Sequence, residues 1–148
     1  MSELYNTKIL RLAMAIPLTE RLGDPDVTVT RTSRICGSRV TVDLKIEKGA
    51  ITGYGQEVKA CALGQAACSL VAGRIIGKTE ADFAPVADAM RAMLAGEGPP
   101  PTGAWSELEI FLPAVEHKSR HGSIMLPFEA VMQGFAEARS GADLETTA

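Results

Sequence analysis

Three cysteines and two histidines are the residues of this sequence that could carry chemistry. Cys36 lies in the tetrapeptide ICGS, Cys61 stands directly before a run of small residues, and Cys68 lies within that run. A cysteine thiolate can bind zinc or iron, or it can attack an electrophilic sulfur. The elements around each thiol decide whether it is held for chemistry or packed in a core.

Cys36 and Cys61 are predicted to be neighbours in space. Residues 39–47 alternate between hydrophobic and polar side chains, and after a lysine-glycine turn residues 50–59 return as a second strand. A hairpin of residues 38–59 brings its outer ends together, so both thiols would share one end of the sheet. Cys61 also precedes a helix, whose N-terminal dipole favours a thiolate. The competing interpretation is that each thiol is a small buried hydrophobe, since free cysteine is among the most buried residue types.

Cys68 and the histidines carry weaker signals. If the helix begins at residue 62, Cys68 lies about 10.5 Å of helical rise from Cys61, whereas two sulfurs on one zinc lie at most about 4.6 Å apart. We therefore expect Cys68 to pack in the core. His117 and His121 precede the last predicted helix but belong to no known zinc motif. His121 is closer to that helix and is the better candidate for a ligand.

Hydrophobic periodicity predicts the elements that must hold these residues. Strands are expected at 27–30, 39–47 and 50–59, with a bulge near Gly53 or Gly55 and with the polar face of 39–47 in solvent. Helices are expected at 4–16, at 62–76, from Thr79 with Asp82 as its capping partner, and around Ile124 to Phe135, where Pro127 must lie in the first turn; residues 107–119 are ambiguous. This order predicts an α+β domain, in which a small antiparallel sheet of about three strands is covered by helices on one face.

Length and composition limit the classes of protein. The chain has 148 residues, 46% of them hydrophobic and 22% charged, with a net charge of -3. These values predict one domain at 1–140 and a flexible tail at 141–148. Without a basic stripe we expect no nucleic-acid partner, and the short, interrupted apolar run at 9–18 predicts neither a signal peptide nor a membrane partner. An odd number of cysteines without an export signal favours free thiols in the cytoplasm.

The order of these motifs resembles the U-type iron-sulfur cluster assembly scaffolds, the family of IscU, SufU and the amino-terminal domain of NifU. The resemblance covers nearly the whole chain and is carried by three segments: LYNTKILRLAMAIP, ICGSRVTVDLKIEKGAI and ACALGQAACSLVAGRIIGK. The SufU-like branch is the most similar. The resemblance implies the α+β fold, and it implies a cysteine desulfurase that delivers sulfur and apo-proteins that accept the finished cluster.

The resemblance also implies a set of ligands, from which this chain departs. The family uses three cysteines and an aspartate, of which Cys36 and Cys61 match the first two cysteines. Ser38 stands at the aspartate position, and the alignment of RHGSIMLPFEAV places Ser123 at the third cysteine, although aligning HGSI differently places Gly122 there. A serine hydroxyl is a hard and weak ligand for iron or zinc. His121 is therefore our candidate for a third ligand, with Ser38, Ser123, His117 or water completing the shell.

Three functions remain open from the sequence. The first is a scaffold or carrier, rather than an enzyme, in which Cys36 and Cys61 hold iron, zinc or a transient cluster, such as a two-iron cluster, and one of them receives sulfur. The second is a thiol-dependent enzyme with Cys61 as nucleophile and His121 as its base. The third is a metal-free relative that binds partners, for which the missing third cysteine is the main support.

Overall fold

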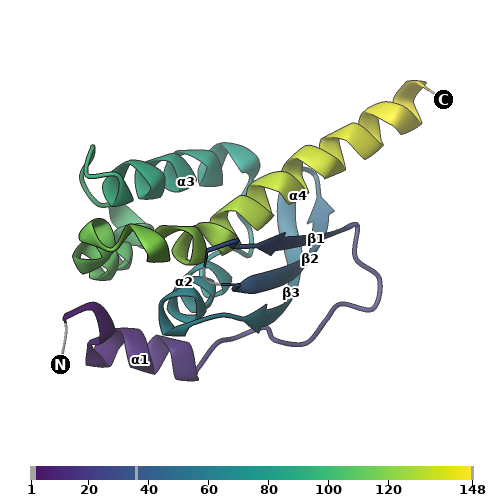
Figure 1. Cartoon of the computed structure of the whole chain (residues 1–148). Helices are drawn as coiled ribbons and strands as arrows, with labels where there is room; N and C mark the ends of the chain where they lie inside the picture. The colour runs from purple at the N-terminus through teal and green to yellow at the C-terminus, as the bar shows by residue number, and fades with distance from the viewer. Residues whose placement is uncertain (1–2, 36, 148) are drawn as a thin grey trace.

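The structure of the chain is a computed structural model that describes the backbone of residues 3–35 and 37–147 and the side chains of residues 4–35 and 37–140. The elements follow in the order η1 (Glu3–Tyr5), α1 (Thr7–Met14), β1 (Val27–Thr32), β2 (Arg39–Glu47), β3 (Ala50–Lys59), α2 (Ala62–Ala72), α3 (Glu80–Leu94), η2 (Gly103–Glu116), η3 (Lys118–Arg120) and α4 (His121–Thr147). Figure 1 shows the sheet beside the helices, with α4 crossing the molecule and extending past the sheet at its C-terminal end.

The three strands form one antiparallel sheet in the order β1-β2-β3, as the alternating pattern predicts. The hairpin of β2 and β3 turns through Lys48 and Gly49, which have φ values of 53° and 81°. The register shifts between Lys45 and Ile46, so Thr52 on β3 is the extra residue of a bulge beside Gly53. The edge strand β1 is two residues longer than predicted, since it ends at Thr32 rather than at residue 30.

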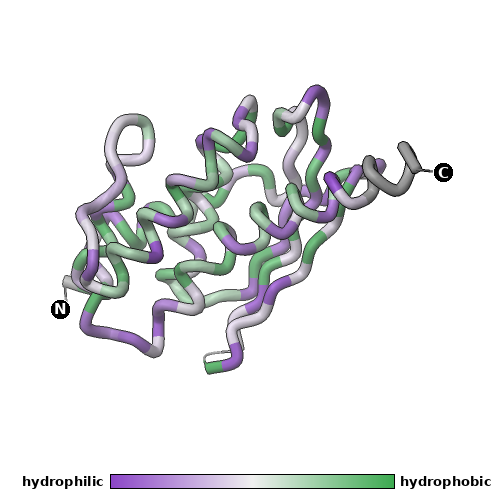
Figure 2. The backbone as a smooth tube through the Cα atoms, turned by 90° about the horizontal axis from the view of Figure 1, so that it is seen from above, coloured by the Kyte–Doolittle hydropathy of each residue, from purple (hydrophilic) through white to green (hydrophobic). Residues whose placement is uncertain are grey.

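Helices α2 and α4 cover one face of the sheet, and the predicted α+β class is confirmed. Val40, Val42 and Leu44 of β2 are fully buried on this face. Helix α4 contacts β1, β2 and α3, and α2 packs against β3, α1 and α4. The strands change between hydrophilic and hydrophobic along their length, as expected of a sheet with one face against the core (Figure 2).

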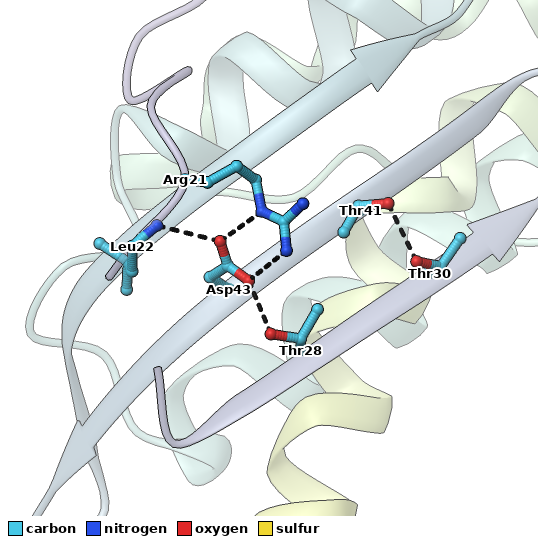
Figure 3. A network of polar contacts seen from close by, with 6 residues as sticks. All are labelled: Arg21, Leu22, Thr28, Thr30, Thr41 and Asp43. Atoms are coloured by element: carbon cyan, nitrogen blue, oxygen red, sulfur yellow. Dashed lines mark hydrogen bonds and ion pairs between the residues drawn. The ribbon is translucent and has the colours of Figure 1, made fainter. Parts of the chain in front are cut away.

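The prediction that the polar face of β2 lies in solvent is wrong at Asp43. Its side chain is fully buried beneath the segment that joins α1 to β1. Arg21 donates to both carboxylate oxygens at 2.6 and 3.0 Å, the Leu22 amide donates at 3.0 Å, and the Thr28 hydroxyl at 2.7 Å (Figure 3). Gly55 lies opposite Asp43, and a Cβ there would strike the carbonyl oxygen of Glu20. A glycine is therefore needed for the segment to approach the sheet so closely.

Several helix boundaries differ from the predictions for identifiable reasons. The predicted helix 4–16 is divided at Asn6, whose side chain accepts a hydrogen bond from the Ile9 amide and so caps α1. The predicted helix 62–76 ends at Ala72. The capping box of Thr79 and Asp82 is confirmed at the start of α3. The ambiguous segment 107–119 lies mostly within the 3-10 helix η2.

Pro127 does not lie in the first turn of the last helix, as predicted, but in the second. Helix α4 begins at His121, so Pro127 is its seventh residue and cannot donate to the carbonyl of Ser123, four positions earlier. The helix continues because Phe128 and Val131 beyond the proline are fully buried in the core. Helix α4 runs on to Thr147, and the predicted boundary between domain and flexible tail at residue 140 stays a prediction. Among the described residues, no helix is long and apolar enough to cross a membrane.

Candidate thiol site

Three segments that are distant in sequence meet at one end of the sheet. Ser38 directly precedes β2, Cys61 is the N-cap residue of α2, and Ser123 lies in the first turn of α4. The Ser123 hydroxyl donates to Ser38 Oγ at 3.0 Å, and Cys61 Sγ lies 3.4 Å from Ser123 Oγ. Ser38 and Ser123 are buried, whereas Cys61 is half-buried. These three residues form what we call the serine-thiol cluster.

Two glycines allow the helices to approach closely enough to form this cluster. A Cβ on Gly64 of α2 would strike Ser123 Oγ and would lie 2.9 Å from Ala60 Cβ. A Cβ on Gly122 of α4 would lie 2.9 Å from Ser33 Oγ, closer than real Cβ atoms come. The first turn of α4 therefore packs closely against the first turn of α2 and against Ser33, at the beginning of the β1–β2 turn. Sequence reasoning missed this role of Gly64 and Gly122, because a glycine in a helix pattern does not reveal what approaches it.

The turn between β1 and β2 lies at the same end of the sheet as the cluster. The Ser33 amide donates to Ser38 O at 2.7 Å, and the Gly37 amide donates to Ser33 O at 2.9 Å. Gly37 has a φ of 73°, a conformation that favours glycine. Cys36 itself lies outside the described residues, so its predicted proximity to Cys61 stays a prediction. Its chain neighbours Ile35 and Gly37 belong to this turn.

The surroundings of Cys61 favour its thiolate. Burial raises the pKa of the thiol, but the hydrogen bond with Ser123, the nearby amides of Gly64 and Leu63 and the positive charge of Arg120 outweigh it, and the pKa is lowered below 9.0. The two amides act without making a cap hydrogen bond of normal geometry to the sulfur. Sequence reasoning anticipated the effect of the helix start but not that of Arg120, which the chain brings to Cys61 only through the fold.

Ser123 has one proton for two neighbours. With its hydroxyl donating to Ser38, the Cys61 thiol is the donor in its own contact with Ser123. When Cys61 loses its proton, the Ser123 hydroxyl must turn toward the sulfur to stabilise the thiolate. The cluster can therefore respond to the charge on Cys61 without a movement of the backbone.

Cys68 has the opposite environment, as its sequence context predicts. It is fully buried in α2, and burial raises the pKa of its thiol to about 12. A thiol that is fully buried and keeps its proton at neutral pH is a poor nucleophile and packs as a small apolar group. Of the two cysteines in the described part of the chain, Cys61 is therefore the one available for chemistry.

Comparison with solved structures relates this arrangement to known proteins. The chain is similar to the amino-terminal part of a nitrogen-fixing NifU-like protein from Brucella abortus, with 39% identity over 93% of this chain and 96% of that one and a TM-score of 0.91. The chain belongs to the NifU-like family of U-type proteins. It also has the fold of a Fervidobacterium islandicum protein described as an iron-sulfur cluster assembly scaffold of the SUF system, with a TM-score of 0.82, 17% identity, and coverage of 89% of this chain and 96% of that one. A scan of family models and a search of curated proteins gave no match.

The serine-thiol cluster lies where this NifU-like chain is expected to hold its ligands. The contact between Ser123 and Cys61 favours the alignment that places Ser123, rather than the exposed Gly122, at the position of the third cysteine. The described residues contain no group of three or more His, Cys, Asp or Glu side chains that could hold a metal ion. Among the cluster residues, the described part of the chain offers one thiol and two hydroxyls, and a second thiolate from Cys36 stays a prediction.

The histidines of this NifU-like chain lie near the cluster along the chain, at the entrance to α4. His121 Nε2 lies 2.7 Å from the carbonyl oxygen of Ala114, so this nitrogen carries a proton and donates it. Only Nδ1 of His121 is then left to bind a metal. His117 is exposed at the end of η2. Neither histidine makes a hydrogen bond to Cys61 in the described structure, and their predicted roles as ligands stay predictions.

Proposed function

We propose that this protein is a scaffold or carrier in iron-sulfur cluster assembly, in which the thiolates of Cys36 and Cys61 hold iron, zinc or a nascent cluster. The observation that carries the proposal is the meeting of Cys61, Ser38 and Ser123 in a chain of the NifU-like family. The names of the two similar structures support the same class of function. A reducing cytoplasm, where thiols stay free, is the compartment that this function needs.

The donor set favours transient holding of the cargo. Thiolates are the preferred protein ligands of iron-sulfur clusters and of structural zinc, whereas the hydroxyls of Ser38 and Ser123 are hard and retain their protons at neutral pH. Two thiolates leave open positions for water, for His121 Nδ1 or for a ligand from a partner. A cargo held in this way is released more readily than one held by four strong ligands, as transfer to an apo-protein requires.

The sulfur of the cluster would come from a cysteine desulfurase. The thiolate of Cys61 or Cys36 attacks the terminal sulfur of a persulfide on that enzyme, a new sulfur-sulfur bond forms, and the enzyme's cysteine leaves as a thiolate. The half-buried position of Cys61 and its lowered pKa support a role for its thiolate in this step.

Metal analysis and anaerobic reconstitution test this function. Wild-type protein is expected to take up iron and sulfide, or zinc, and Cys36→Ser and Cys61→Ser are expected to lose most of it. Cys68→Ala is the matched control, since it removes a thiol that is fully buried in the core, and it should retain the metal. Stoichiometric metal in both Cys36→Ser and Cys61→Ser would contradict the proposal.

A thiol-dependent enzyme is the second candidate, and the lowered pKa of Cys61 is the observation that favours it. The side chain that contacts the sulfur is Ser123 rather than His121. Because Nε2 of His121 donates its proton to the Ala114 carbonyl, His121 could act as a base only through Nδ1. If the protein is such an enzyme, Cys61 in metal-free His121→Ala protein should be alkylated more slowly at neutral pH than Cys61 in the metal-free wild type. An unchanged rate would exclude His121 as the base. A metal-free wild type that still binds a desulfurase would instead favour the partner-binding relative.

A further inference from the structure

Helix α1 has hydrophobic side chains on both of its faces. Ile9 is fully buried against the core, and residues three and four positions apart share one face of a helix. The face opposite Ile9, which we call the α1 stripe, consists of the exposed residues Thr7, Leu10, Arg11 and Met14. Met14 is 87% exposed, so its side chain contributes little to the packing of this chain.

A pocket lies next to the α1 stripe, between the first turn of α1 and the second half of η2. It has a volume of about 580 Å³, and its lining includes Thr7 and Lys8 of α1 and Glu109, Ile110 and Leu112 of η2. Thr7 belongs both to the stripe and to the wall of the pocket. The stripe therefore leads directly into the pocket.

Exposed apolar side chains gather at the stripe and the pocket. A single exposed apolar side chain is common on a protein surface and needs no explanation. Six large hydrophobic side chains are exposed in the described part of the chain, and three of them lie here: Leu10, Met14 and Leu112. Apolar side chains that are grouped beside a pocket are typical of a surface that binds another molecule.

We propose that two copies of this chain pair through the α1 stripe, with Met14 of each copy entering the pocket of the other. In an antiparallel pair of α1 helices, the two-fold axis passes between Leu10 and Arg11. Met14 and Thr7 each lie three and a half residues from that axis, about 5 Å along the helix. Met14 of one copy then faces Thr7 of the other copy, at the pocket.

The charges beside these apolar groups are complementary in such a pair. Arg11 lies one helical turn before Met14, and Glu109 lines the pocket that Met14 enters. Both side chains are exposed, and neither forms an ion pair within the described residues, so each is available to the other copy. The two-fold symmetry forms the contact of Arg11 with Glu109 twice. An anionic membrane would attract Arg11 but repel Glu109, so a second copy fits this surface better.

The size of the surface predicts a reversible dimer. Helix α1 has eight residues, and a contact made by one short helix and one pocket lies at the small end of protein interfaces, where association is weak. None of the residues of the stripe or the pocket belongs to the serine-thiol cluster. The pairing is therefore independent of the proposed function, and either can fail without the other.

Sedimentation velocity over a range of protein concentrations tests the pairing. The wild type is expected to change from monomer to dimer as its concentration rises to the millimolar range. Met14→Gln keeps the length of the side chain and should weaken the dimer about ten-fold or more, because each dimer loses two apolar contacts. Ile76→Gln is the matched control, since Ile76 is 49% exposed beside the β2–β3 hairpin, outside the stripe and the pocket. This variant should dimerise as the wild type does.

An exchange of charges tests the geometry of the pair. Arg11→Glu and Glu109→Arg should each weaken the dimer, and the double variant should restore it, because the ion pair forms again with its charges exchanged. Urea denaturation should show equal stability of all variants, since the changed side chains are exposed. Dimerisation that the single variants leave unchanged, or that the double variant does not restore, would overturn this arrangement.

Three further results would overturn the proposal. The first is a wild type that stays monomeric up to millimolar concentration. The second is association that continues beyond the dimer, because a two-fold pair is closed. The third is a monomeric wild type that binds vesicles of phosphatidylglycerol and loses this binding in Met14→Gln, which would make the stripe a membrane contact.

Discussion

Two buried polar clusters of this protein are built in opposite ways. At Asp43, a carboxylate accepts hydrogen bonds from Arg21, Leu22 and Thr28, and the result holds the 15–26 segment against the sheet (Figure 3). In the serine-thiol cluster the groups are small and neutral, and the single hydroxyl proton of Ser123 serves both Ser38 and Cys61. Both carboxylate oxygens of Asp43 have hydrogen-bond donors, whereas the serine-thiol cluster leaves the Cys61 thiol available for reaction.

The difference separates stability from function. A buried charge that is fully hydrogen-bonded adds rigidity, and removing a partner is costly. A half-buried thiol beside donors that can turn toward it is held for something that arrives from outside. If this contrast is correct, substitutions in the serine-thiol cluster should change ligand binding more than stability, and substitutions at Asp43 should do the reverse.

The largest expected effect is a gain of metal binding in Ser123→Cys. The new thiol would lie beside Cys61 at the position of Ser123 Oγ, now 3.4 Å from the sulfur. If four ligands to structural zinc together contribute about 10–16 kcal/mol, one further thiolate is worth on the order of a hundred-fold in affinity. Competition with a chelator would measure the affinity for zinc in wild type and variant.

Ser69→Cys is the control for this gain. Ser69 is also a buried serine, but it lies in the middle of α2, so its substitution adds a thiol away from the cluster. Its zinc affinity should match that of the wild type. Equal affinities of Ser123→Cys and Ser69→Cys would show that position 123 does not face the metal.

The second effect is a loss of stability in Asp43→Asn. The amide cannot accept charge-assisted hydrogen bonds from Arg21, and its NH2 group would face donors, so the free energy of unfolding should fall by about 2–3 kcal/mol. Denaturation by urea at neutral pH would measure this loss. Metal binding and alkylation of Cys61 should change little, because the substitution lies in the middle of β2.

The same substitution should remove part of the acid sensitivity of the protein. Burial raises the pKa of Asp43, but the hydrogen bonds from Arg21, Thr28 and Leu22 outweigh it and hold the pKa below its ordinary value of 3.8. The stability gained from this lowered pKa is complete above pH 3.8 and is lost as the pH falls through the folded-state value. Asp88→Asn, at an exposed helix ion pair, is the control and should cost less than about 0.5 kcal/mol. Equal losses in the two variants would contradict the contrast.

The sequence predicted the hairpin because alternation along residues 39–59 is a local property. It could not reveal the burial of Asp43, because the segment that buries this side chain has no hydrophobic periodicity. That segment, which includes Arg21 and Leu22, packs against the sheet at Gly55. At the site, the family resemblance placed Ser38 and Ser123, and the structure shows Ser123 hydrogen-bonded to both Ser38 and Cys61. The role of Arg120, the close approach at Gly64 and the position of Pro127 depend on how α4 meets α2, which no local pattern encodes.

The smallest expected effect is at Tyr54, which tests whether a buried polar group without a hydrogen-bond partner lowers the stability of this core. Its side chain is buried opposite Leu44, and its hydroxyl has no hydrogen-bond partner among the described residues. Burial raises the pKa of Tyr54 well above 10.0, so the hydroxyl stays protonated and neutral. Tyr54→Phe removes a polar group that gains nothing from its position, and the free energy of unfolding should stay equal or rise by about 1 kcal/mol.

The same substitution at Tyr5, which is half-buried near the N-terminus, serves as the control and should leave stability unchanged. A loss of stability in Tyr54→Phe would mean that the hydroxyl is hydrogen-bonded in solution. Asp43 would then no longer differ from Tyr54 in having hydrogen-bond partners for its polar atoms. A gain in stability would rank three buried polar side chains by their hydrogen bonding. Asp43 is fully hydrogen-bonded, the Ser123 hydroxyl is shared between two neighbours, and the Tyr54 hydroxyl has no partner among the described residues. Of the three, only Ser123 is then suited to exchanging hydrogen-bond partners.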